Sequence, residues 1–466
     1  MHRSTCLYGA VLGCLSWLLV GAAWGQDWPQ WRGPNRDGKV TGFKAPATWP
    51  KELKEKWKTT VGDGVSTPAL VGDRLYVFTR EGGEEVIRCL NAADGKEIWQ
   101  DKYAGEPATG SAGGFPGPRS SPAVADGKVV TLGVRGVVSC LEAASGKLLW
   151  RKDDYPGLAP QFFASSSPLI QDGVVFVQLG GVEAGRGFVG GGGRGTGGVI
   201  AYDLSTGAKK WEWKGDAPAY GSPILATVAG EKTLLMPTAG NMAALGTADG
   251  KQLWFVSYTQ GRYNAATPIV TGDTVIYGGL QVGMSAEKLA KKGSELEGTI
   301  VWTNDQHSLI YNTPVLKDGK LYGLSTTSNL FCLDAETGKT AWSAPLNPGA
   351  AGAAAPAPAK AGGGGGFGGG AGGGFGGGGG GGKGKGGGGR GGFGNTAGYG
   401  SVVDAGSVLF ALSPAGSLVV YEPNPTEYKE LARYKVAEAG TYAYPIIAGN
   451  RIFIKDATAV KLLAIE

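Results

Sequence analysis

The sequence predicts an all-β fold, an eight-bladed β-propeller whose blades are four-stranded antiparallel sheets. Three observations support this prediction. A tryptophan recurs behind a small-residue turn, a small residue usually followed by proline opens each unit, and Asp-Gly or Gly-Asp turns separate short apolar runs. A repeat of short strands with a period of roughly 40–50 residues is typical of propellers.

The first repeated motif is a turn of small and polar residues in which a glycine precedes the tryptophan by four positions, as in Gly95 to Trp99 and Gly146 to Trp150. A blade cannot bury both of its faces alone, so it must dock on its neighbours. A large rigid ring at each interface supplies much of the apolar area for this docking. We therefore assign a docking role to Trp57, Trp99, Trp150, Trp211, Trp254, Trp302 and Trp342.

The second motif marks the start of each unit. A serine or threonine followed by proline stands at residues 67–68, 121–122, 167–168, 222–223, 267–268 and 313–314. Residues 400–402 and 444–445 resemble two further openings, which gives eight units. Most openings are about 43–55 residues apart, and the one long gap, from Pro314 to Val402, holds a blade and a glycine-rich insertion.

The domain organisation follows from these motifs. Residues 1–25 have the basic start, apolar run and small residues of a cleaved signal peptide, so we expect export to the periplasm or the exterior, with an uncleaved anchor as the alternative. Residues 26–52 form an N-terminal lead-in segment and residues 53–466 the propeller. The strand from Lys54 to Val61 should complete the last blade and close the ring. Residues 345–397 are expected to be a disordered glycine-rich insertion, and residues 285–296 a short surface helix.

Composition excludes several chemistries. Only two histidines are present, and one of them, His2, lies in the predicted signal peptide, so clusters of histidine ligands and histidine-based triads are excluded. Cys89, Cys140 and Cys332 each precede a tryptophan by ten residues, a register that alanine occupies in other units, so we expect small buried thiols rather than disulfides. The net charge is +5, and the predicted signal peptide and glycine-rich insertion account for it. The folded body is therefore nearly neutral, which argues against a nucleic-acid partner.

The tryptophan repeat resembles that of the pyrroloquinoline quinone (PQQ) propellers, the quinoprotein alcohol dehydrogenase-like superfamily, over nearly all of residues 53–466. Residues 27–34 (DWPQWRGP) also look like the lead-in of exported bacterial PQQ-like repeat proteins, which are similar to BamB, an outer-membrane assembly factor. The resemblance implies two competing activities. BamB-like propellers bind partners without catalysis, whereas quinoprotein dehydrogenases hold PQQ and calcium at the centre of the ring. The chain has no adjacent cysteine pair and no carboxylate that matches the calcium ligand or the base of those enzymes.

The residues just before each inner strand are expected to line one mouth of the central channel. They are Arg119, Ser165, Tyr220, Asn264, Tyr311, Asn312, Tyr399 and Tyr442, with Asp305 and His307 slightly upstream. Aromatic rings, amides and one guanidinium suit a planar anionic cofactor, and Arg119 would pair with its carboxylate. The alternative is that these side chains only fill or solvate the channel. We assign no catalytic residue and no metal ligand.

Our first hypothesis is an exported, non-catalytic scaffold that binds envelope proteins. We expect it to be a monomer without a transmembrane segment in the mature chain. The second is a PQQ- and calcium-dependent dehydrogenase that oxidises an alcohol or a sugar. A third is a polysaccharide-binding or lyase-like propeller. Because a fold does not determine function, the choice rests on the site.

Overall fold

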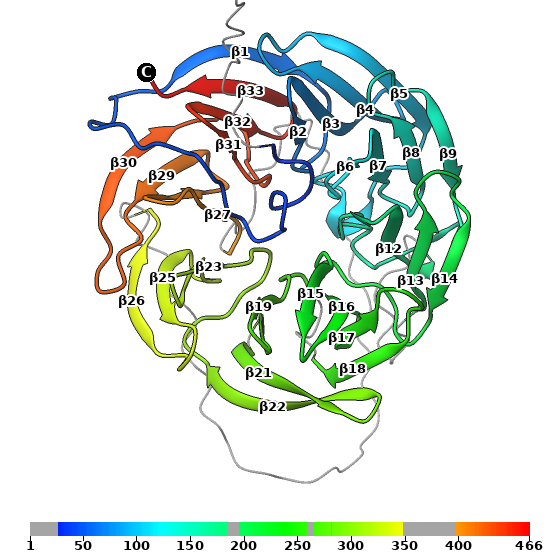
Figure 1. Cartoon of the computed structure of the whole chain (residues 1–466). Coiled ribbons are helices and arrows are strands. Elements are labelled where there is room, and N and C mark those ends of the chain that lie inside the picture. The colour runs from blue at the N-terminus through cyan, green and yellow to red at the C-terminus, as the bar shows by residue number, and fades with distance from the viewer. Residues whose placement is uncertain (1–26, 184–194, 259–263, 281, 348–397) are drawn as a thin grey trace, which may run out of the picture.

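The computed structural model describes residues 27–183, 195–258, 264–280, 282–347 and 398–466. It is a ring of eight antiparallel sheets, which confirms the predicted propeller (Figure 1). The predicted signal peptide and nearly all of the glycine-rich segment at residues 345–397 lie outside the described residues.

The blades follow one another along the chain and are numbered one to eight in the order of their first strands. Blade one contains β2 (Ala69–Val71), β3 (Arg74–Glu81), β4 (Glu84–Asn91) and β5 (Glu97–Ala104), and blade two contains β6 (Ala123–Ala125), β7 (Lys128–Leu132), β8 (Val138–Glu142) and β9 (Leu148–Lys152). Blade three contains β11 (Leu169–Gln171), β12 (Val174–Glu183), β13 (Thr196–Asp203) and β14 (Lys209–Trp213), and blade four contains β15 (Ile224–Val228), β16 (Glu231–Pro237), β17 (Asn241–Gly246) and β18 (Gln252–Ser257). Blade five contains β19 (Ile269–Thr271), β20 (Thr274–Gly279), β21 (Gly283–Lys292) and β22 (Glu295–Asn304), and blade six contains β23 (Val315–Lys317), β24 (Lys320–Leu324), β25 (Asn329–Asp334) and β26 (Thr340–Pro345). Blade seven contains β27 (Ser401–Asp404), β28 (Leu409–Leu412), β29 (Ser417–Tyr421) and β30 (Glu430–Lys435), and blade eight contains β31 (Ile446–Ala448), β32 (Arg451–Lys455) and β33 (Ala459–Ala464). A short strand, β10 (Leu158–Ala159), pairs with β12, and a 3-10 turn, η1 (Gly110–Ala112), precedes β6.

The ring closes as predicted. The strand β1 (Lys54–Thr60) pairs antiparallel with β33, so the eighth blade takes its outer strand from the beginning of the propeller. The first and last strands of the propeller therefore lie in one sheet, which leaves no open blade edge at the seam.

The tryptophans contact the neighbouring blade through both their edge and their face. Six of the seven donate an indole Nε1 hydrogen bond to a backbone carbonyl of the next blade, over 2.8–3.2 Å. The seventh, Trp254, packs against Tyr277 of blade five. The face of the ring lies on the turn glycine of the next blade, so that a Cβ on Gly146 would come within 2.4 Å of Trp99. The glycine of the repeat is thus part of the docking surface for the preceding tryptophan.

The small residue of the repeat lies directly opposite the tryptophan on the adjacent strand. Cys89 faces Trp99, Cys140 faces Trp150 and Cys332 faces Trp342. Alanine takes the same place opposite Trp211, Trp254 and Trp302. The three cysteines are free and buried, which confirms that they are structural thiols.

Hydroxyl groups at the blade openings link one blade to the next around the axis. Thr67 N–H donates to Ser121 Oγ, Ser121 N–H to Ser167 Oγ, and Ser167 N–H to Ser222 Oγ, over 2.9–3.2 Å. The same bond joins Thr267 to Thr313, and Tyr444 N–H donates to Thr67 Oγ1 across the seam of the ring. The residue before the proline is therefore serine or threonine because its hydroxyl accepts an amide from the preceding blade.

Replacing Ser222 by alanine is expected to lower the free energy of unfolding by about 1–2 kcal/mol. Ser222 is buried, so the variant leaves the amide of Ser167 without its acceptor on the protein. Ser205→Ala on an exposed turn is the control, since its hydroxyl takes no part in this chain of bonds. Urea unfolding measures the difference, and equal stability of the two variants would contradict the linking role.

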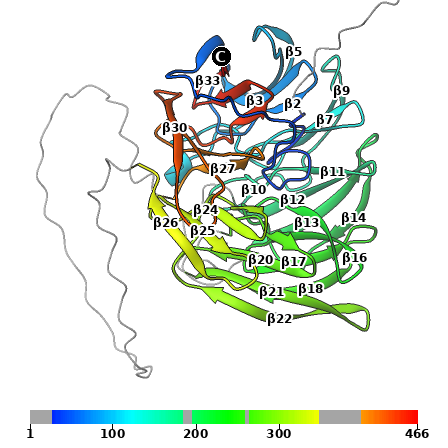
Figure 2. The ribbon, with the colours of Figure 1, turned by 60° about the vertical axis from the view of Figure 1, so that its left-hand side comes forward.

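The expected helix at residues 285–296 is wrong. These residues belong to β21 and β22, the longest hairpin of the molecule's described part, and both views place β22 at the outer edge of the ring (Figure 1, Figure 2). Leu289 and Leu296 are buried in a cluster with Trp254 of blade four. Packing against the neighbouring blade therefore overrides the helical composition of this segment.

Candidate functional site

A cavity of about 410 Å³ lies at the centre of the ring, and residues from the openings of all eight blades and from the lead-in segment line it. Eight of its lining residues are aromatic: Trp31, Phe115, Phe162, Tyr220, Tyr311, Tyr399, Tyr442 and Tyr444. Thr67, Ser121, Ser165 and Ser222 add hydroxyl groups, and Arg119 is the one charged side chain among the lining residues that the structure describes. The volume falls in the range of small-molecule sites.

The structure brings together most of the residues predicted to line the channel mouth. Arg119, Tyr220 and Tyr311 line the cavity, as do Ser165, Tyr399 and Tyr442. The rings of Tyr311 and Tyr399 are stacked with centroids 4.1 Å apart, and Tyr442 meets Tyr399 edge to face at 5.0 Å. Phe115 also meets Tyr442 edge to face, with ring centroids 4.7 Å apart.

Asn264 and Asn312 are not among the lining residues. Both are buried, and their side-chain amides bond to backbone carbonyls: Asn264 to Thr238 and Tyr258, over 2.7 and 2.8 Å, and Asn312 to Gly398 over 2.9 Å. A buried amide is held where it satisfies neighbouring backbone groups. These two asparagines therefore hold loops behind the cavity wall, a role that position in the repeat could not distinguish from lining.

Arg119 is positioned by the loop that contains η1. Its Nη2 donates to the carbonyls of Ala112 and Phe115, over 3.0 and 2.8 Å. Its Nη1 is enclosed and has no partner among the described residues. Burial lowers the pKa of Arg119 to about 10, still well above neutral pH, so the side chain places a positive charge on an otherwise aromatic wall.

The lead-in segment (residues 27–52) forms the floor of the cavity, which the sequence did not predict. Figure 1 shows this dark-blue segment running from the rim beside β1 to the centre of the ring. Its backbone pairs with Leu70 of blade one and Asp404 of blade seven, and Pro29 accepts a bond from Val124 of blade two. Trp31 from this segment lines the cavity. The motif at residues 27–34 is therefore explained by a structural role at the axis.

Two buried arginines hold the lead-in segment in place. Arg32 Nη2 donates to the carbonyl of Pro314 in blade six over 2.7 Å. Arg36 donates to the carbonyls of Ser167 and Pro168 in blade three and to that of Pro223 in blade four. Burial lowers the pKa of both guanidinium groups from its ordinary value. With these contacts the segment touches six of the eight blades.

Asp305 and His307 do not belong to the cavity. Asp305 is exposed, and His307 is buried with its ring stacked on Phe331 at 4.4 Å and its Nε2 3.0 Å from Thr340 Oγ1. Burial lowers the pKa of His307 to about 4.

The free energy of unfolding is expected to fall by about 2–3 kcal/mol through His307 as the pH drops from about 6.5 to about 4. Below pH 6.5 the unfolded chain binds a proton at this histidine, whereas the folded protein does not until about pH 4, so acid favours unfolding in this window. Urea unfolding at a series of pH values measures the slope. His307→Gln should remove this part of the slope, and an identical pH profile in the variant would contradict the assignment.

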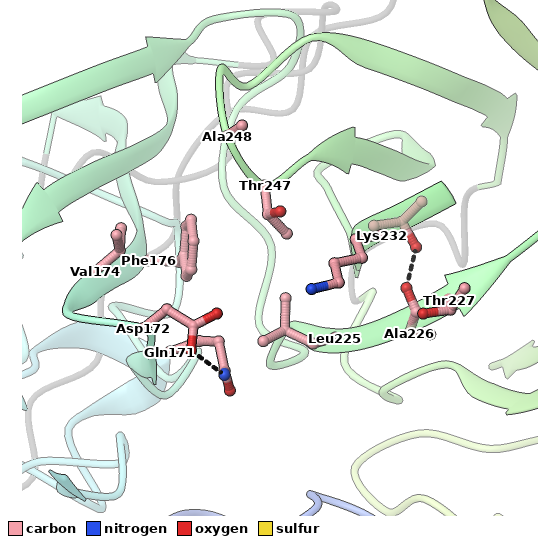
Figure 3. A pocket seen from close by; sticks show the side chains of 11 residues that line it. Gln171, Asp172, Val174, Phe176, Leu225, Ala226, Thr227, Lys232, Thr247 and Ala248 are labelled. Atoms are coloured by element: carbon pink, nitrogen blue, oxygen red, sulfur yellow. Dashed lines mark hydrogen bonds between the residues drawn. The ribbon is translucent and has the colours of Figure 1, made fainter. Parts of the chain in front are cut away.

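A second hollow of about 440 Å³ lies between blades three and four, away from the axis. Figure 3 shows Gln171, Asp172 and Phe176 on one side and Leu225 and Lys232 on the other. The Gln171 amide donates to Asp172 within the same blade over 2.8 Å. None of the residues predicted for the site lies here.

Comparison with known proteins places the chain in a family. Residues 40–114 and 83–344 match the family described as outer membrane protein assembly factor BamB. The chain belongs to this BamB family. Among the described residues, no helix has the length and hydropathy needed to cross a membrane.

Two curated relatives are each 25% identical to the chain. One is a tetrathionate hydrolase of Acidithiobacillus ferrooxidans, matched over 51% of this chain and 46% of that protein. The other is BamB of Yersinia pestis, matched over 61% of this chain and 59% of that protein. The chain thus spans about half of the length of these relatives.

Solved structures share the fold at lower identity. BamB of Moraxella catarrhalis aligns with a TM-score of 0.54 at 14% identity, over 88% of this chain and 97% of that one. The quinohemoprotein alcohol dehydrogenase ADHIIG of Pseudomonas putida HK5 aligns with a TM-score of 0.57 at 14% identity, over 94% and 80%. Both alignments show similarity of the fold alone.

PQQ with calcium is the cofactor that the quinoprotein resemblance implies. Calcium takes six to eight oxygen ligands, with carboxylates prominent among them. The described lining offers phenols, hydroxyls and a guanidinium, and no carboxylate. This set of side chains suits an organic anion such as PQQ but does not fit the calcium ion that accompanies PQQ in the quinoproteins.

Proposed function

We propose that the protein is an exported, non-catalytic scaffold that binds or assembles partner proteins in the cell envelope, as the name of its family indicates for BamB. The observation that carries the proposal is the match to the BamB family over most of the ring. The aromatic and cationic lining of the central cavity supports it, because the described lining residues do not include the paired carboxylates of a general acid and base.

Partner binding is tested by site-specific photo-crosslinking of the full chain in its own cells. Large apolar side chains are exposed on outer strands, at Ile98 of β5, Leu148 of β9 and Ile300 of β22, and these positions would carry the photoreactive residue. Lys44, exposed in the lead-in segment, is the control position. We expect adducts with the same envelope protein from neighbouring positions of one face. A protein recovered from the cytoplasm without adducts would overturn the proposal.

A second function, a PQQ-dependent dehydrogenase, is favoured by one observation: Arg119 and the surrounding rings suit the carboxylates and the plane of the quinone. Titration of the mature protein with PQQ, with and without calcium, separates the two functions. Calcium-dependent saturable binding followed by alcohol oxidation would favour the dehydrogenase. Absence of calcium dependence would favour the scaffold.

A further inference from the structure

The hollow between blades three and four is formed where blade four departs from the repeat. Its innermost strand, β15, has five residues, whereas the innermost strands of blades one, two, three, five, six and eight have three each. The longer hairpin of β15 and β16 brings Leu225, Thr227 and Lys232 to one wall of the hollow. The volume of about 440 Å³ falls in the range of small-molecule sites.

In blade one, an arginine fills the corresponding place beside the next blade. Arg74 is the first residue of β3, and its Nη1 donates to the carbonyl of Ala144 in a turn of blade two over 2.8 Å. The carboxylate of Asp73, in the turn before β3, lies 3.9 Å from Arg74 Nε. Tyr76 donates its hydroxyl to the carbonyl of Ala143 over 3.1 Å. The guanidinium group of blade one is therefore held by a turn carboxylate and by a carbonyl of the next blade.

Blade three lacks this cation. Val174 begins β12 as Arg74 begins β3, because each pairs with the last residue of the strand before it, and Phe176 takes the place of Tyr76. Neither side chain of blade three carries a charge or a hydroxyl group. Val174 and Phe176 line the hollow, so the space that a guanidinium group occupies in blade one is open in blade three.

The acceptors that would hold a guanidinium group are nevertheless present. Asp172 supplies a carboxylate in the turn before β12 and lines the hollow. Ala248, which also lines it, stands six residues before the tryptophan of its blade, as Ala144 does in blade two. Among the described residues, the Asp172 carboxylate accepts a bond from the Gln171 amide and forms no ion pair. A cation supplied from outside the chain would therefore find both kinds of acceptor that hold the arginine of blade one.

Lys232 gives the opposite wall a positive charge. Figure 3 shows its ammonium group directed into the hollow, across from Asp172, with Leu225 between them and Phe176 beside Asp172. Both charged side chains are exposed, and in the part of the chain that the structure describes they form no ion pair with each other. The hollow thus presents a carboxylate on one side, an ammonium group on the other and apolar side chains between the two.

We propose that this hollow is a binding site for a small linear molecule with a guanidinium group at one end and a carboxylate at the other. The guanidinium group bonds to Asp172 and to the carbonyl of Ala248, the carboxylate pairs with Lys232, and the stem packs on Leu225. A guanidinium group matches a carboxylate through its planar set of donors and stacks on aromatic rings, so Phe176 favours it over a simple ammonium group. The site is independent of the scaffold function, since it needs neither export nor a protein partner.

The test is calorimetric titration of the mature full chain with γ-guanidinobutyrate at low ionic strength, because salt screens exposed charges. Two comparison compounds each lack one charged end. γ-Ureidobutyrate has a neutral group in place of the guanidinium group, and agmatine has no carboxylate. We expect saturable binding of γ-guanidinobutyrate and binding of each comparison compound that is weaker by about fivefold or more, because each loses one charge-assisted contact.

Two matched variants assign the binding to Asp172. Asp172→Asn should weaken the binding of γ-guanidinobutyrate by about fivefold or more, whereas Asp126→Asn, in the corresponding turn of blade two, should leave it unchanged. The two aspartates have φ values of +50° and +49°, a conformation that asparagine also adopts, so both variants are expected to fold.

Val174→Arg places in blade three the side chain that blade one has at this position. It should fill the hollow and abolish binding of the added ligand. The proposal is overturned if γ-guanidinobutyrate does not bind saturably at millimolar concentration, if γ-ureidobutyrate binds equally well, or if the two asparagine variants bind alike. It is also overturned if Val174→Arg folds and binds like the parent, and if this variant does not fold, the asparagine pair decides. None of these outcomes depends on whether an envelope partner is found.

Discussion

Replacing Arg36 by methionine is expected to lower the free energy of unfolding by about 3–5 kcal/mol. Arg36 is almost fully buried and donates to three carbonyls of blades three and four and to the side chain of Gln30. Methionine has a similar length but no donor, so these carbonyls lose their partner in a site that water does not reach. The expected loss is smaller than the sum of four bonds, because burial of the cation itself costs free energy and lowers the pKa of its guanidinium.

Urea unfolding of the mature chain measures this loss, with Lys44→Met as the matched control. Lys44 lies in the same lead-in segment but is exposed, so its replacement should change stability by less than about 0.5 kcal/mol. Limited proteolysis gives a second readout, since a lead-in segment released from blades three and four should be cleaved faster. A loss within 1 kcal/mol of the control would show that the segment does not depend on Arg36.

The ring could be predicted from the sequence because its determinants are local and repeated. The glycine four residues before Trp99, the small residue opposite that tryptophan and the hydroxyl at Ser121 recur in most units. Each copy strengthens the assignment of the others. The closure by β1 followed from the same pattern, since Trp57 carries the repeat without a blade before it.

The elements that the sequence did not predict depend on contacts made only once. Arg32 and Arg36 bond to carbonyls that lie 282 and 131–187 residues away, and no repeat indicates such partners. The hairpin of β21 and β22 is stabilised by leucines that pack on blade four, against the local helical composition.

The candidate site was predictable in part. Position in the repeat placed Arg119, Tyr220 and Tyr311 at the axis, and they line the cavity. Position in the repeat does not determine whether a polar side chain points to the axis or to the backbone behind it. Asn264 and Asn312 were therefore grouped with the residues that line the cavity. Trp31 was missed because the lead-in segment has no counterpart in the repeat.

Substitution of a turn glycine is expected to have the second large effect on the free energy of unfolding. Gly146→Ala is expected to lower the free energy of unfolding by about 3–4 kcal/mol. Gly146 has a φ of +75°, which costs alanine about 1–2 kcal/mol. Its Cβ would also lie 2.4 Å from the ring of Trp99, which its own bond to the carbonyl of Ala143 holds in place. The ring cannot retreat without loss of that bond or of packing, which adds about 1–3 kcal/mol.

Gly127 in the same blade is the matched control for this substitution. It has a φ of +68°, yet nothing lies within 4 Å of the position that its Cβ would take. Gly127→Ala should therefore cost only the backbone contribution of about 1–2 kcal/mol. Thermal or urea unfolding of the two variants separates backbone strain from ring contact. Equal losses would mean that glycine is needed at the turn for its φ alone and that the tryptophan docks without its help.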